Sequence, residues 1–437
     1  MRVFITALLP VLTLTLPMIA QTNSQLDELW EKEHVTKILP SNVRHRDLKI
    51  YLDALRSKGV KVSEAGRSVL NKEIYQVEWG NGPLRVFLWS QMHGDEPTAT
   101  SALIDLFAIL QRNRDRDWAK RIASAMTIRA VPMLNPDGAD MFLRRNTQGL
   151  DINRDAIDQK SPEAQLLKKL RDDWSPQIGF NLHNQNWLTS VGSTPKQAAI
   201  SFLVVYGDEP KTSNPGHERN RRLAAEMIEA IGSHIPGHIA RYDDEFTPTA
   251  FGDNFSAWGT PTILIETGAL HGKSEMFLVK LNFVAIAAAL RALTDGSERE
   301  RDPGPYDNLP PNSSGRIINF IFQNASIIDP AVQGEPARGN IAVALQRRRA
   351  EFPTPGVIRR IGDTGTLTGL EEYDASEFNV AGRFEPLKPG AFAELLFYKK
   401  GRTVDWAAPD LERAFPPDAI FSLGKWVKGE GIVPLKK

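Results

Sequence analysis

Short apolar runs alternate with longer amphipathic segments between about residues 48 and 295. The short runs are rich in branched and aromatic side chains and predict strands at Leu84–Trp89, Met126–Pro132, Ile178–Leu182, Phe202–Tyr206 and Thr262–Ile265. In the longer segments apolar side chains recur every three or four positions, which predicts helices at Thr98–Gln111, Pro162–Leu170, Asn220–Ile231 and Lys280–Leu293. This alternation predicts an α/β fold, a mostly parallel mixed sheet with helices on both faces.

The pattern changes at about residue 297. Residues 298–315 are charged at first and then rich in proline and asparagine, so we expect a linker there. Beyond it, Arg316–Asp329 and Ala391–Tyr398 have the apolar character of strands, and glycine and proline recur between short β-rich runs. The sequence therefore predicts an α/β domain at residues 21–297 and a small β-sandwich-like domain at residues 316–437. The latter contains no histidine, and we assign it no chemistry.

The first twenty residues have the composition of a signal peptide. One positive charge precedes an apolar stretch from Ile5 to Ala20, and we expect cleavage before Gln21. A membrane anchor is the alternative, but the stretch is short for a span and is interrupted by two prolines. The chain has no cysteine, and therefore neither a disulfide framework nor a lipid-attachment cysteine. We expect export to a bacterial periplasm or secretion, with no stable membrane anchor after cleavage.

The charge balance of the chain argues against nucleic acid as a partner. Lysine and arginine together number 53, as do aspartate and glutamate, and the formal net charge is zero. A chain without a net field has nothing that attracts nucleic acid, so no nucleic-acid partner is expected.

Candidate metal ligands follow the ends of predicted strands. His93 and Glu96 lie in Gln-Met-His-Gly-Asp-Glu-Pro, between a predicted strand and a predicted helix, and can converge on one ion. Catalytic zinc takes three protein ligands and leaves one position for water. His183 is the third candidate, because it ends the run Ile-Gly-Phe-Asn-Leu-His. Glu266 ends the run Thr-Ile-Leu-Ile-Glu, where burying a carboxylate is costly unless it has a function or a partner.

An arginine-rich segment lies between the two histidines. After an Asn-Pro-Asp-Gly turn, the chain reads Arg-Arg-Asn-Thr-Gln-Gly-Leu-Asp-Ile-Asn-Arg from Arg144 to Arg154. Arginines close to a metal suggest recognition of anions, since the guanidinium fork suits carboxylates. Each motif alone has an ordinary structural explanation, such as a turn or a solvated pair. Their joint occurrence at successive strand ends is what indicates an active site.

Together these motifs resemble the zinc carboxypeptidase family, the funnelin metallocarboxypeptidases, over roughly residues 48–294. That family carries His-x-x-Glu, an Asn-Pro-Asp-Gly turn, an Arg followed by Asp-Leu-Asn-Arg, a distant His and a late Glu. All occur here in that order, with Ile152 in place of the usual Leu. The resemblance implies a zinc carboxypeptidase-like fold and an enzyme that removes the last residue of peptides with a free C-terminal carboxylate. Cell-wall peptides are one candidate substrate.

The resemblance also implies a role for each site residue. A single zinc ion would be held by His93, Glu96 and His183, with Glu266 as general base and acid. The scissile carbonyl would be polarised by Arg144, with the neighbouring Arg145 as the alternative. The terminal carboxylate would be bound by Asn153 and Arg154, and Arg145 is counted with these substrate-binding candidates.

One departure from the family pattern concerns the tyrosine that closes over the substrate, and the role of Asp253 in the side-chain pocket has two readings. Family members carry a tyrosine about twenty residues before the catalytic glutamate, whereas here Tyr242 lies early and Phe246 occupies the more natural place. Asp253 either favours a basic terminal side chain or orients its loop. The alternative functions are a zinc amidase of the same fold, acting on cell-wall peptides or N-acyl amino acids, and an inactive binding or interaction protein.

Overall fold

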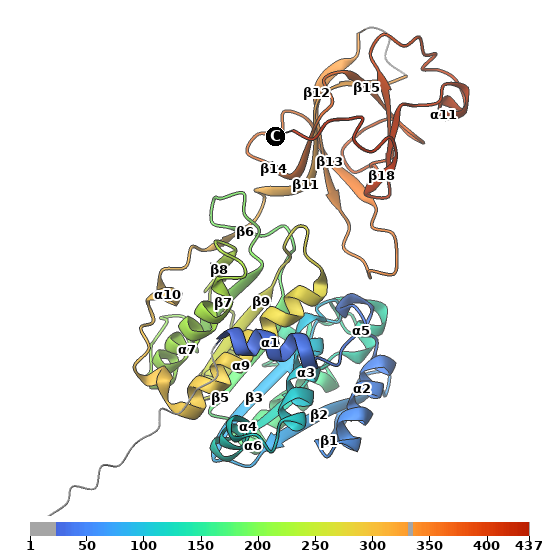
Figure 1. The fold of residues 1–437 in the computed structure, drawn as a ribbon. Coiled ribbons are helices and arrows are strands. Elements are labelled where there is room, and N and C mark those ends of the chain that lie inside the picture. The colour runs from blue at the N-terminus through green and yellow to red at the C-terminus, as the bar shows by residue number, and fades with distance from the viewer. Residues whose placement is uncertain (1–22, 331–334, 437) are drawn as a thin grey trace, which may run out of the picture.

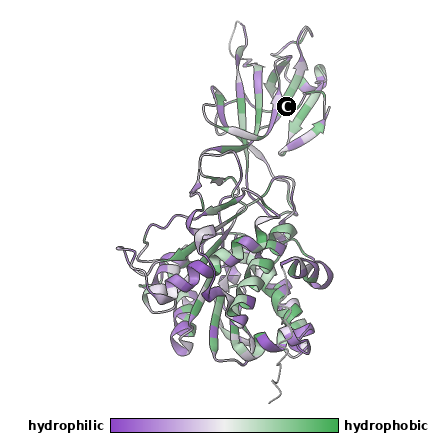
Figure 2. Ribbon diagram, turned by 60° about the vertical axis from the view of Figure 1, so that its left-hand side comes forward, coloured by the Kyte–Doolittle hydropathy of each residue, from purple (hydrophilic) through white to green (hydrophobic). Residues whose placement is uncertain are grey.

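The computed structural model describes residues 23–330 and 335–436. The predicted signal peptide, residues 1–20, lies outside the described residues. Within them, an α/β unit extends to about residue 295 and a strand-rich unit begins near residue 317 (Figure 1). In both units apolar residues gather along the strands, and in the first also along the helices that cover its sheet (Figure 2).

An eight-stranded mixed sheet forms the centre of the α/β unit, in the order β1-β2-β4-β3-β5-β9-β7-β8. The strands are β1 (Lys61–Arg67), β2 (Glu73–Gly80), β3 (Leu84–Ser90), β4 (Met126–Val131), β5 (Ile178–Asn184), β7 (Ile200–Val205), β8 (Ile239–Arg241) and β9 (Thr262–Thr267). Its central strands, from β4 through β3 and β5 to β9, are parallel, whereas β1, β2 and β7 form antiparallel pairs. The predicted fold class is confirmed. All five predicted strands of the unit are present.

Helices cover both faces of the sheet. They are α1 (Asn23–Glu33), α2 (His45–Ser57), α3 (Thr98–Arg112), α4 (Asp117–Ala125), α5 (Pro136–Met141), α6 (Pro162–Trp174), α7 (Pro215–Gly232), α8 (Phe251–Ala257) and α9 (Glu275–Asp295), with 3-10 turns at η1 (Pro40–Asn42) and η2 (Ile152–Arg154). Strand β3 shows the two-sided burial: Val86 and Leu88 pack with α3 and α9, while Phe87 and Trp89 pack with α6 and α8. Successive side chains of a strand point to opposite faces, so such a strand is apolar throughout.

Helix α9 is the one described helix that is long and apolar enough to cross a membrane. It is a core helix here, because Val279, Phe283 and Leu290 are buried and it packs against α3 and α7.

The segment predicted to be a linker lies along the α/β unit. It contains η3 (Ser297–Arg299), α10 (Gly304–Asp307) and β10 (Asn312–Ser313), which pairs with β6 (Ser190–Val191). Its Tyr306 is buried, and the phenol oxygen accepts a hydrogen bond from the Val204 amide at 2.9 Å. This buried aromatic ring holds the segment against β7.

The strand-rich unit is one continuous hydrogen-bonded sheet wrapped around an aromatic core. Its elements are β11 (Ile317–Ile327), β12 (Ala337–Leu345), β13 (Gly356–Gly362), β14 (Thr368–Asp374), β15 (Phe378–Gly382), β16 (Leu395–Lys399), α11 (Leu411–Ala414), β17 (Ala419–Ser422) and β18 (Lys425–Lys428). Strand β11 pairs with β12 on one side, and with β14 and then β15 on the other. Because β11 is shared in this way, the layers around Phe322, Phe397 and Phe421 are not separate sheets.

The turn between β12 and β13, residues 346–355, reaches back to the α/β unit (Figure 1). Arg349 on this turn is buried, and its guanidinium donates to the backbone oxygens of Ser41, at 2.9 Å, and of Ala139. Next to it, Glu351 forms an ion pair with Arg44. The turn is therefore fixed beside α5.

Candidate active site

The loop between β3 and α3 carries the first two predicted ligands, His93 and Glu96. Its entry is conformationally demanding, because Gln91 adopts a left-handed backbone with φ of 51° while fully buried. A Cβ at Gly94 would lie only 2.0 Å from the carbonyl carbon of Gly138 in α5. Only glycine allows this approach, and the Asn-Pro-Asp-Gly turn thereby braces the loop that presents the ligands.

The third ligand candidate and the candidate base lie on adjacent parallel strands. His183 of β5 and Glu266 of β9 are direct partners in the register of this pair. Both face the carboxyl edge of the sheet, where α/β proteins gather their ligands. The structure thus brings Glu266 to the edge at which His93 and Glu96 also lie.

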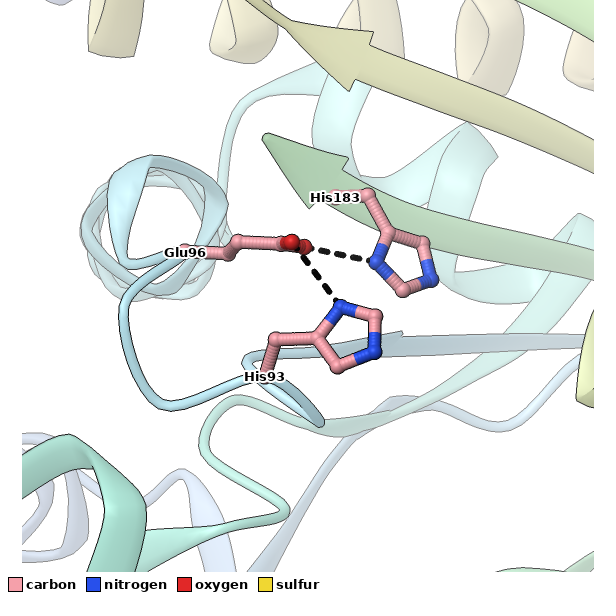
Figure 3. Close-up of side chains that lie close together, drawn as sticks. All are labelled: His93, Glu96 and His183. Carbon is pink, nitrogen blue, oxygen red and sulfur yellow. Dashed lines mark hydrogen bonds and ion pairs between the residues drawn. The ribbon is translucent and has the colours of Figure 1, made fainter. Parts of the chain in front are cut away.

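Three side chains from these elements converge on one point (Figure 3). Glu96 lies between the rings, with one carboxylate oxygen 2.9 Å from His93 Nδ1 and the other 2.7 Å from His183 Nδ1. All three residues are buried, and one candidate ligand atom from each lies within 4.8 Å of the others. Two imidazole nitrogens and a carboxylate oxygen are a donor set that suits zinc. The residues therefore fit the predicted metal.

Asp151 contacts this cluster through His93, although no role was predicted for it from the sequence. His93 Nε2 donates to an Asp151 carboxylate oxygen at 3.0 Å, so a metal ion at the cluster would be held through Nδ1. Such a partner fixes the tautomer and the orientation of a ligating imidazole. The signal was available, because Asp151 is the acidic residue of the Asp-Ile-Asn-Arg motif itself.

The cluster is strongly polarised. Burial would raise the pKa of Glu96, but the two adjoining imidazoles outweigh it and hold that pKa well below its usual range. Burial would lower the pKa of His93, but the carboxylates of Glu96 and Asp151 raise it to about 9. Two carboxylates around one ring thus favour positive charge at this point, which a bound cation would supply.

Glu266 stands apart from the three ligands in its electrostatics. It is 7% exposed, and one of its carboxylate oxygens, Oε2, has no hydrogen-bond partner among the described residues. Burial, together with the negative charge of Glu96, raises the pKa of Glu266 well above its ordinary value. A buried carboxyl group that has a raised pKa and an oxygen without a hydrogen-bond partner can accept a proton and later release it.

The structure distinguishes the two neighbouring arginines. Arg144 turns into the cluster, with its guanidinium 3.1 Å from carboxylate oxygens of both Glu96 and Asp151. Arg145 turns away and donates to the backbone oxygen of Gly149 at 2.9 Å. Arg144 therefore lines the cavity at the cluster, whereas Arg145 does not.

That cavity, of about 310 Å³, also takes in the two residues predicted to bind a terminal carboxylate. Asn153 is fixed from behind, since its side-chain oxygen accepts from the Phe251 amide at 3.0 Å. Arg154 is exposed, and within the described part of the chain its guanidinium donates to the Asn153 backbone oxygen alone, at 2.9 Å, so most of its donors remain available.

Tyr242 and Phe246 both line the same cavity. The Tyr242 ring packs on β7 and β9, and the charge of Glu266, with burial, raises the pKa of its phenol. A phenol is therefore present close to the candidate base, although the sequence spacing placed Tyr242 early.

Asp253 lines the cavity from α8. Its carboxylate accepts from the Thr247 amide at 2.9 Å, so it does orient the preceding loop. Burial raises the pKa of Asp253 to about 6. An acid whose pKa is higher in the folded chain stabilises the fold while protonated. That stabilisation is complete below about pH 4, the unfolded value, and is lost as the pH rises through about 6.

Replacing Asp253 by asparagine should remove this pH dependence. We expect the free energy of unfolding of Asp253→Asn, relative to wild type, to rise between pH 4 and pH 7 by on the order of 2 kcal/mol. Urea denaturation of metal-free protein at both pH values measures it. Asp243→Asn, at an exposed carboxylate of the same cavity, is the control. Parallel pH profiles for wild type and Asp253→Asn would show that this carboxyl group titrates normally.

Comparison with known proteins agrees with the motifs. Residues 49–234 match the family model described as zinc carboxypeptidase. The chain is 33% identical over 165 residues to "Carboxypeptidase 2" of Trichophyton equinum, which is 38% of this chain and 30% of that protein. The chain thus spans about a third of the length of the curated relatives it matches. The predicted resemblance is confirmed for residues 49–234.

Two solved structures match part of the chain. A metallo-carboxypeptidase from Burkholderia cenocepacia is 18% identical with a TM-score of 0.47, covering 58% of this chain and 69% of its own. A metallo-carboxypeptidase from Pseudomonas aeruginosa, in complex with (2-guanidinoethylmercapto)succinic acid, is 17% identical with a TM-score of 0.47, covering 57% and 69%.

Proposed function

We propose that this chain, whose residues 49–234 match the zinc carboxypeptidase family, is a zinc metallocarboxypeptidase that hydrolyses the C-terminal peptide bond of peptides. The observation that carries the proposal is the convergence of His93, Glu96 and His183 beside Glu266 at one edge of the sheet. The same cavity holds Arg144 and the pair Asn153 and Arg154.

In this proposal His93, Glu96 and His183 hold the zinc ion. When bound, zinc supplies a Lewis acid and makes a water molecule nucleophilic near neutral pH. Asp151 keeps the His93 ring in the tautomer that binds, through its hydrogen bond to Nε2.

Glu266 moves the proton. Its unpartnered oxygen, Oε2, accepts a proton from the attacking water. The raised pKa of the carboxyl group favours keeping that proton until the leaving amine takes it up. Arg144 presents its guanidinium to the oxygen on which negative charge develops. A donor aimed in this way is commonly worth about 3 kcal/mol of transition-state stabilisation.

Asn153 and Arg154 confine cleavage to the chain end. Their amide and guanidinium groups line the cavity and suit the free carboxylate of a last residue. A same-fold amidase for cell-wall peptides or N-acyl amino acids remains the second candidate, since it would need the same metal ligands. The Asn-Pro-Asp-Gly and Asp-Ile-Asn-Arg motifs favour the peptidase, because they belong to the carboxypeptidase pattern that this chain resembles.

We further propose that the enzyme is exported to a periplasm or secreted. The support is the charge and apolar pattern of residues 1–20, and the absence of cysteine is compatible with it.

The decisive experiment uses protein starting at Gln21 and peptides in two forms, as free acids and as C-terminal amides. Zinc content is measured on the same preparation, and products are identified by mass spectrometry. We expect single residues to be lost from the free acids only, and a chelator to abolish that loss. Bound zinc without trimming of peptides would favour the amidase, and absence of zinc would contradict both enzymes.

Arg154→Ala should weaken binding of the free-acid peptides specifically. Loss of a charge-assisted contact to the terminal carboxylate is expected to raise KM by about tenfold or more, with residual activity on amides unchanged. Arg145→Ala, one cation removed nearby but outside the cavity, is the matched control and should behave as wild type. An equal loss on acids and amides in Arg154→Ala would refute the role given to Arg154.

A further inference from the structure

A second cavity, of about 680 Å³, adjoins the cluster of His93, Glu96 and His183 at Glu96. It shares Glu96, Arg144 and the stretch Asn184–Asn186 with the first cavity. The α/β unit supplies one wall, with Trp187 and Leu188, and the strand-rich unit supplies the opposite wall. That opposite wall consists of residues Ile317, Ile318, Ala344, Leu345, Gln346, Arg347, Arg359 and Leu367. The strand-rich unit thus forms part of the surroundings of the site.

Contacts with the α/β unit hold the wall from the strand-rich unit in a fixed position. The turn 346–355 is fixed by buried Arg349, whose guanidinium donates to backbone oxygens of η1 and α5 and lies 5.3 Å from the centre of the Phe142 ring. The apolar side chain of Leu188 packs against Ile318 and Ala344. Arg347, two residues before Arg349, is therefore carried to a defined place at the cavity.

Two cations on this wall lack ion-pair partners. Arg347 and Arg359 are exposed, and neither forms a salt bridge within residues 23–330 and 335–436. Arg347 contacts the Phe142 ring, 5.8 Å from its centre. The acidic residues of the cavity are Glu96, already engaged with both imidazoles, and Asp95, which forms no salt bridge within the described residues. The cavity therefore offers two guanidinium groups that no salt bridge engages among the described residues.

The two cavities imply a direction for a bound peptide. If Asn153 and Arg154 hold the terminal carboxylate in the first cavity, the scissile bond lies at Glu96 and Arg144. The residues before that bond must then leave the cluster on the other side, where the second cavity continues from the same two side chains. Trp187 and Leu367 offer apolar contacts there, and Arg347 offers a charge.

We propose that the cleft between the two units binds the substrate upstream of the scissile bond, and that Arg347 selects peptides with an acidic side chain there. This rests on the proposed carboxypeptidase function and adds a substrate class to it. The strand-rich unit, to which the sequence assigned no chemistry, thereby takes part in recognition.

The test compares peptides that share one C-terminal residue and differ by Glu or Gln at a single upstream position, scanned over the last few residues. Wild type should prefer the Glu peptide in kcat/KM by about fivefold at its best position, the size expected of a partly exposed ion pair. That preference should shrink with added salt. Arg347→Gln should abolish it, and Arg347→Lys should retain most of it. Arg348→Gln removes a neighbouring exposed cation that lines another cavity, and should leave the preference intact.

Each outcome has a separate meaning. Equal Glu-to-Gln ratios in wild type and Arg347→Gln, with both enzymes active on neutral peptides, would overturn the role of Arg347. Absence of turnover on every peptide would contradict the proposed function instead. In that case, binding of fluorescently labelled Glu and Gln peptides to wild type and Arg347→Gln still decides the inference: a preference lost with Arg347 supports it, and equal affinities overturn it.

Discussion

Replacing Glu266 by glutamine is expected to lower kcat by about 10²–10⁴-fold while zinc stays bound. Glutamine has nearly the same shape but cannot accept a proton, so the attacking water loses its base and the leaving amine its acid. Zinc should remain, because Glu266 lies outside the group of three converging ligands. Stability should not fall, since an amide avoids the cost of burying a carboxylate that is 7% exposed.

The measurement pairs turnover of a free-acid peptide with zinc content and thermal unfolding of the same sample. Glu245→Gln, at an exposed carboxylate of the same cavity, is the control and should keep nearly full activity. A kcat within tenfold of wild type in Glu266→Gln would assign the proton transfer to another group. Loss of zinc would make Glu266 a ligand instead.

The second large effect is expected at Glu96. Changing it to glutamine removes the one carboxylate, among residues 23–330 and 335–436, that contacts both imidazoles, at 2.7 and 2.9 Å. Zinc affinity should fall by more than the roughly 10–100-fold that loss of an outer partner costs, and turnover should fall to background. Dialysis followed by metal analysis measures the loss.

Two further variants show whether the loss of zinc affinity is specific to Glu96. Asp151→Asn removes only a partner of His93 and should show the smaller, roughly 10–100-fold, loss of affinity. Asp95→Asn changes the carboxylate next to Glu96 in sequence, which is not in the cluster, and should keep its zinc. A Glu96→Gln protein with full zinc content would contradict the proposed ligand set.

Periodicity in the sequence was sufficient to predict the centre of the α/β unit. Strands β3, β5, β7 and β9 are buried along most of their length and read as largely apolar runs, whereas β4 alternates buried apolar residues with the partly buried Thr127 and Arg129. Strand β1 was not predicted, because it is mostly exposed at the sheet edge and shows no apolar pattern. The tertiary pairing with β2, rather than its own side chains, makes it a strand.

The positions of the candidate ligands followed from the same logic. Parallel strands end at one edge, so the polar residues that close β5 and β9 had to be neighbours, and the loop after β3 joins them there. Local sequence thus determined which residues meet: His93, Glu96, His183 and Glu266.

What the sequence could not decide are the directions of side chains in loops and the contacts between distant segments. Arg144 and Arg145 are adjacent in a loop without periodicity, and only the packing of that loop turns one toward the cluster and the other toward Gly149. Arg347 reaches the site because a turn about two hundred residues away docks through a buried arginine on backbone oxygens. Such contacts depend on the assembled surfaces of both units, which no local pattern of apolar and polar residues encodes.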